Sequence, residues 1–113
     1  MSDMDEFGAN LQRKLEDFLA SLRADEGVKK WIDHPHFTAM YEKYEANVRS
    51  SLAEAIERYK AKAVEAESQD GFFRDLTIQT IKETLDQYLD SFQRIMQSSA
   101  KTMVAAFGDL SRG

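Results

Sequence analysis

The chain has 113 residues, enough for one domain with a core of its own. Hydrophobic residues make up 42% of it and charged residues 31%, a composition typical of a folded protein rather than a disordered one. The net charge of −5 disfavours binding to the phosphate backbone of a nucleic acid, and the absence of cysteine excludes disulfides, thiolate metal sites and cysteine nucleophiles.

The first segment has apolar residues at helical spacing after an acidic start. Ser2 and Asp5 resemble a capping box, and the nearby carboxylates suit the positive end of a helix dipole. The spacing predicts a helix over residues 3–24. Gly8 is expected to weaken its start by about 1 kcal/mol relative to alanine. The apolar face consists of Met4, Phe7, Leu11, Leu15, Phe18 and Leu22.

The helical phase changes at Asp25–Gly27, because Val28 and Trp31 lie well around the helix from the preceding apolar face. This change predicts a kink or a break, followed by a short helical turn over residues 27–33. We expect Trp31 to close one end of the molecule, and a role as an anchor for a partner is the alternative. Pro35 then suits the first turn of a new helix.

Three rows of apolar residues with an eleven-residue period occupy the middle of the chain. Their spacing averages about 3.67 residues per turn, close to that of a straight α-helix, and predicts a helix over residues 35–68. The pairs Glu45–Arg49 and Glu54–Arg58 are expected on its outward face. The rows are Phe37, Val48 and Tyr59; Tyr41, Leu52 and Ala63; and Tyr44, Ala55 and Ala66.

Two series of mostly apolar residues, each with a period of seven residues, predict a last helix over residues 72–107. Gly108 is expected to end it. The residues Ile81, Tyr88 and Ile95 widen the apolar face, which suits burial against two neighbouring helices. Three residues fall outside the seam and are expected to cover the end of the bundle near the preceding loop: Phe72, Phe73 and Leu76.

These elements predict a single all-α domain over residues 1–113, built as an elongated antiparallel three-helix bundle. The second and third long helices form a hairpin that a shorter, kinked first helix covers. The first helix is too short to cover the whole hairpin, so we expect a homodimer or larger assembly with coiled-coil-like contacts. The alternative is that residues 28–32 extend its cover far enough. The expected interface residues are Tyr41, Tyr44, Leu52, Leu85, Leu89, Phe92, Met96 and Met103.

One cluster resembles a metal site: Asp33, His34 and His36 lie together at a helix corner. The competing interpretation is that Asp33 or His34 caps the following helix. The sequence has no phosphate-binding glycine motif and no nucleophile elbow. We therefore expect neither an enzyme nor a cofactor.

The resulting functional prediction is a non-enzymatic protein that acts in protein–protein interaction or assembly through apolar helix faces. Its partners would be copies of itself and another protein. One alternative is a small acidic regulator of a partner's basic surface, because the net charge resides in the first 70 residues. Another is metal or ligand binding through His34 and His36. The acidic N-terminus and the lack of an 18-residue apolar run predict a cytoplasmic protein with no membrane insertion and no nucleic-acid partner.

Overall fold

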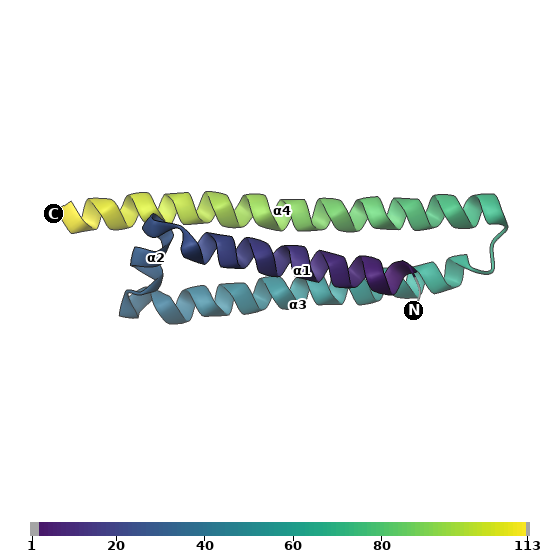
Figure 1. Cartoon of the computed structure of the whole chain (residues 1–113), viewed down its shortest axis with the longest axis horizontal. Helices are drawn as coiled ribbons and strands as arrows, with labels where there is room; N and C mark the ends of the chain where they lie inside the picture. Colours follow the sequence, from purple (N-terminus) through teal and green to yellow (C-terminus); the bar gives the residue numbers. More distant parts are fainter. Residues whose placement is uncertain (1–2, 113) are drawn as a thin grey trace.

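The chain folds into four α-helices with no β-strand in the part that the structure describes, residues 3–112. This computed structural model places α1 (Asp3–Ala24), α3 (Pro35–Ala66) and α4 (Gly71–Arg112) alongside one another, with the short α2 (Glu26–Ile32) turned across one end (Figure 1). The all-helical prediction is confirmed. The side chains of residues 107 and 109–112 lie outside the description, as does Ser2 with its expected cap.

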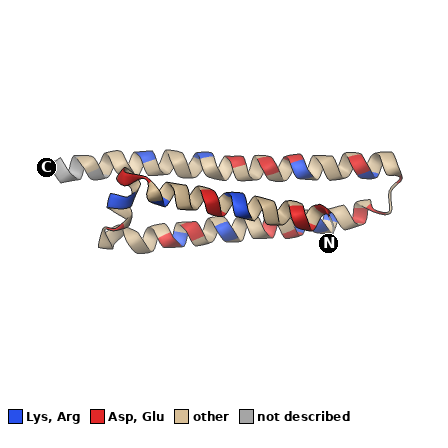
Figure 2. Cartoon of the chain, in the orientation of Figure 1, with Lys and Arg blue, Asp and Glu red and all other residues tan. Residues whose placement is uncertain are grey.

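The molecule is a rod of 65 × 18 × 17 Å. Its length is that of α4, whose 42 residues span about 63 Å at 1.5 Å per residue. We call the end that α2 covers the head and the end with the α3–α4 connection the loop end. Charged residues of both signs are distributed along all the long helices rather than gathered in one block (Figure 2).

The change of phase near residue 25 is a complete break between helices. Asp25 has an extended backbone (φ −64°, ψ 126°), and its carboxylate accepts a hydrogen bond from the amide of Val28 at 3.1 Å. An Asp in this position satisfies an amide that has no partner within the helix. The chain therefore ends α1 at Ala24 and starts α2 at Glu26 in a new direction.

The glycine expected to end the last helix does not do so, because α4 continues through Gly108 to Arg112. A glycine stop uses a left-handed backbone, and no described glycine has a positive φ. One glycine costs a helix only about 1 kcal/mol, which is too little to end it. At the other boundary, α3 ends at Ala66 rather than at Ser68.

The apolar core has two parts. The main cluster joins α1, α3 and α4 and includes Leu11, Leu52 and Leu85, each at most 1% exposed. The second fills the head, where Trp31 of α2 is 4% exposed and meets the ring of Tyr41 edge-on at 5.4 Å. The prediction that Trp31 closes one end is therefore confirmed.

Gly8 has a role in packing that its low helix propensity does not indicate. A Cβ atom at this position would lie 2.8 Å from Cγ2 of Ile56 on α3, closer than two carbon atoms pack. The missing side chain thus lets α1 approach α3. A residue that weakens the helix locally is needed for packing between helices.

The loop end shows a correction. Phe72, Phe73 and Leu76 do not cover the end of the bundle, because they are 72%, 56% and 53% exposed. The cause is their position on α4: Phe72 lies about 140° and Leu76 about 180° around the helix from the buried Leu85. The first turns of α4 therefore present an apolar surface to water.

Candidate interaction surface

Most of the residues predicted to form an interface already belong to the core of the single chain. They are buried by α1, α2 and their own hairpin partner, so in this conformation they are not available to a second molecule. The sequence pattern identified their apolar face but not the neighbour that covers it. The buried members are Tyr41, Leu52, Leu85, Leu89 and Met96.

The other three predicted residues, Tyr44, Phe92 and Met103, are half-buried. Tyr44 and Met103 lie at a shallow groove of about 310 Å³ at the head, between α3 and α4. The indole Nε1 of Trp31 and the hydroxyl of Tyr41 are buried beside it without a hydrogen-bond partner in the described residues. The groove is lined by Trp31, Met40, Tyr41, Lys43, Tyr44, Asn47, Ser99 and Met103.

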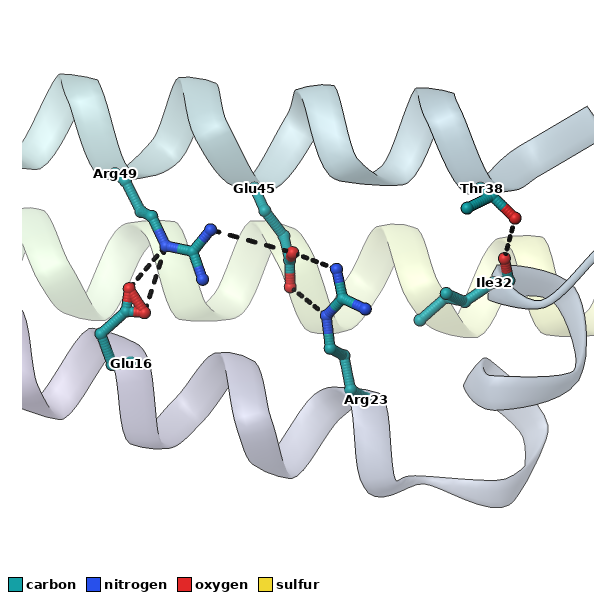
Figure 3. A network of polar contacts seen from close by, with 6 residues as sticks. All are labelled: Glu16, Arg23, Ile32, Thr38, Glu45 and Arg49. Atoms are coloured by element: carbon teal, nitrogen blue, oxygen red, sulfur yellow. Dashed lines mark hydrogen bonds and ion pairs between the residues drawn. The ribbon is translucent and has the colours of Figure 1, made fainter.

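A buried carboxylate links α3 to α1 (Figure 3). Glu45 is 2% exposed, and both of its oxygens accept hydrogen bonds from Arg23, at 2.9 Å from Nε and 2.5 Å from Nη2. Arg49 lies 4.0 Å from the same carboxylate and donates to Glu16 of α1. Glu45 is therefore not on the outward face, as the sequence analysis expected, but inside the α1–α3 contact.

The electrostatics of this network fit a structural clamp. The hydrogen bond to Glu45 raises the pKa of Arg23, and the hydrogen bond to Glu16 raises the pKa of Arg49. Burial, followed by the negative charge of Glu45, raises the pKa of Tyr41 to about 12. Arg23 pairs with the buried Glu45, so removing either partner alone would change the α1–α3 contact, and removing Arg23 would leave a buried carboxylate without its main partner.

The sequence contained a signal for the burial of Glu45. Seven residues separate Glu45 from Leu52 and eleven separate it from Ile56, so all three lie on the same face of α3. A charged residue on an apolar face requires a partner from another helix. The identity of that partner, Arg23, depends on how α1 lies against α3.

The two histidines form a helix corner. Nδ1 of His34 accepts a hydrogen bond from the amide of His36 at 3.3 Å, and the two rings stack at 5.1 Å. The interpretation of His34 as the cap of the following helix is confirmed. Among the side chains that the structure describes, no group of three or more His, Asp or Glu is placed to hold a metal ion.

Large apolar side chains are exposed mainly on α4. They occur at two places along it: in its first turns at the loop end, and on its middle section, where Tyr88 packs edge-on against Phe92 at 5.2 Å. The exposed residues of α4 are Phe72, Phe73, Leu76, Tyr88 and Ile95, and those of α3 are Met40 and Val64. These are the residues that the described surface offers to another protein.

No helix in the described part of the chain is both long and apolar enough to cross a membrane. Comparisons of the chain with protein-family models, with curated proteins and with solved structures find no match.

Proposed function

We propose that this chain is a non-enzymatic interaction protein, an elongated antiparallel three-helix bundle that self-associates through apolar residues exposed on α4. One observation carries the proposal: Tyr88 and Ile95 are 37% and 55% exposed on the middle section of α4. A monomeric protein rarely leaves large apolar side chains grouped in water, since burying them yields about 25 cal/mol per Å².

The predicted function is unchanged, but a different surface of α4 is now proposed to carry it out. The seam residues that first suggested an interface, such as Leu85 and Met96, are at most 2% exposed. The flank of the same helix, where Tyr88 and Ile95 lie, has no covering helix within the chain. The broad apolar face of α4 is thus covered on one side only.

The test is light scattering after gel filtration at several concentrations. We expect a mass near twice the 13.0 kDa of one chain at micromolar concentration. Ile95→Asp should return the mass to that of one chain, because it places a charge within the apolar contact. Gln97→Asp is the matched control, since Gln97 is exposed near α1 instead. A single-chain mass at all concentrations would contradict the proposal.

A second candidate function is favoured by the loop end. Four exposed carboxylates and one exposed arginine lie within eight residues of Phe72 and Phe73 in the sequence. Acidic residues close to exposed apolar ones suit a basic amphipathic segment of a partner protein. Salt would weaken such a complex steeply, whereas an apolar homodimer would resist it. The charged residues are Glu65, Glu67, Asp70, Arg74 and Asp75.

A further inference from the structure

One side of α4 carries no charged residue between Thr77 and Thr102. At 100° per residue, eleven positions of this segment fall within a sector of about 120°. We call this the neutral face of α4. Its members are Thr77, Thr80, Ile81, Thr84, Tyr88, Ser91, Phe92, Ile95, Ser98, Ser99 and Thr102, of which Ile81 is buried in the main core cluster and Phe92 is half-buried against it.

The charged residues of the same segment lie on the other side of the helix, toward α1 and the solvent beyond it. Nζ of Lys82 lies 5.7 Å from the centre of the Phe7 ring on α1, and Asp86 lines a groove with Phe7. Arg94 pairs with Asp90 at 2.8 Å. In a chain of net charge −5, a second copy packed on the neutral face would therefore meet no charged residue of this segment of α4 there.

Burying the neutral face would not leave its threonine hydroxyls without a hydrogen-bond partner. The hydroxyls of Thr80, Thr84 and Thr102 already donate to backbone carbonyls one turn earlier, at 2.9, 2.8 and 3.0 Å. A donor that is satisfied within its own helix costs little when water is removed from it. These threonines therefore suit a contact between helices, although each side chain has a polar atom.

Five of the seven serine and threonine residues on the neutral face are placed symmetrically about Ser91, whereas Thr77 and Ser99 have no hydroxyl counterpart. Thr84 and Ser98 lie seven residues before and after it, and Thr80 and Thr102 lie eleven before and after it. An isologous contact needs a surface that is complementary to itself. In an antiparallel pair centred on Ser91, small residues would face small residues.

The large apolar residues fit the same arrangement. Tyr88 lies three residues before Ser91 and Ile95 lies four after it, so Tyr88 of one copy would pack beside Ile95 of the other. The face from Thr80 to Thr102 is about 33 Å long. At about 10 Å across, the width of one helix, it offers roughly 330 Å² per copy, so exposed side chains of α3 beside it would have to add to the contact for a stable dimer.

We propose that two copies pack the neutral faces of α4 against each other, antiparallel, about a two-fold axis at Ser91. This inference rests on the proposed self-association and specifies its contact. The occupant is a second copy because the face is self-complementary and offers no charge for a foreign partner to recognise.

Cysteine cross-linking tests the contact directly, because the chain has no cysteine of its own. Under mild oxidation, Ser91→Cys should become a covalent dimer, since residues at a two-fold axis come within the Cα separation of about 7 Å that a disulfide requires. Gln97→Cys, exposed on the α1 side, should stay uncross-linked.

The register is tested with Thr80→Cys and Thr102→Cys. A mixture of these two variants should yield the mixed dimer, and each alone should yield none. Self-linked dimers of both variants would mean a parallel arrangement and overturn the inference. A dimeric mass with no cross-link at Ser91→Cys would overturn this contact but leave self-association standing. A single-chain mass would overturn both.

Discussion

The two ends of the rod are both rich in aromatic residues, yet they differ in burial. At the head, Trp31 and Tyr41 are 4% and 3% exposed, because α2 turns across α3 and α4. At the loop end, Phe72 and Phe73 are more than half exposed, because no helix covers the outer side of α4 there. The burial of an aromatic residue thus depends on a covering element, not on its own apolarity.

The same contrast separates the covered interior of the hairpin from its uncovered surfaces. Where α1 and α2 cover it, residues are buried and even a carboxylate is paired. Where they do not, apolar residues remain available to another molecule. Substitutions in covered regions should therefore lower stability, and equivalent substitutions in uncovered regions should not.

The largest expected effect is at the head. Trp31→Ala should lower the free energy of unfolding by about 3–5 kcal/mol, because it removes the largest side chain of the head core. Phe72→Ala should lower it by less than about 0.5 kcal/mol, because its ring already faces water. Urea unfolding followed by circular dichroism, at one protein concentration, measures both. Equal losses would contradict the comparison of the two ends.

The next effect concerns the buried carboxylate. Arg23→Ala should cost about 3 kcal/mol, because it leaves Glu45 buried without its main partner. Arg94→Ala is the control, since Arg94 is 78% exposed and its ion pair contributes less than about 0.5 kcal/mol. Glu45→Met, which removes the buried charge, should cost less than Arg23→Ala. The reverse order in urea unfolding would show that the Arg23–Glu45 pair is not a structural clamp.

Replacing each of two glycines with alanine should change the stability in opposite directions. Gly8→Ala should cost about 1–3 kcal/mol, because its Cβ would meet Ile56. Gly108→Ala should stabilise the protein by a few tenths to about 1 kcal/mol, because nothing lies within 4 Å of its Cβ position and alanine favours the helix. Thermal unfolding of the two variants compares them. Stabilisation by Gly8→Ala would contradict the close approach of α1 to α3.

The last effect is a dependence of stability on alkaline pH, which appears only outside the neutral range. The pKa of Tyr41 is about 12 in the folded protein against 10.0 in the unfolded chain, so the folded state retains the proton longer. Its contribution, up to about 3 kcal/mol, is complete below pH 10 and is lost between pH 10 and pH 12. Tyr41→Phe should flatten this part of the stability–pH curve. An unchanged slope would show that the hydroxyl is not buried.

Local features of the sequence were sufficient to predict where most of the helices lie. The spacing of apolar residues predicted α1 over 3–24 and a second long helix from residue 35, and the change of phase at Asp25–Gly27 predicted the interruption. These features succeed because helix formation and capping depend on neighbours within a few residues. The end of α4 was missed because a glycine permits a stop without requiring one.

The interaction surface could be predicted only in part from the sequence. The eight predicted interface residues do lie on apolar faces, but five of them are core residues. The surface that remains, with Tyr88 and Ile95 at its centre, could be identified only once α1 was placed on the opposite side of α4. Spacing tells which residues share a face, whereas exposure depends on which helix covers that face.

By itself, the sequence determined that this chain is all helix, where it is interrupted, and which residues turn inward together. Only the tertiary structure decided that Glu45 is enclosed by α1, that Gly8 is a point of contact, and that one flank of α4 stays open. The physical reason is the distance along the chain over which the interactions act. A helix is specified by interactions along a few turns, but burial is specified by segments far apart in the chain that come to lie against each other.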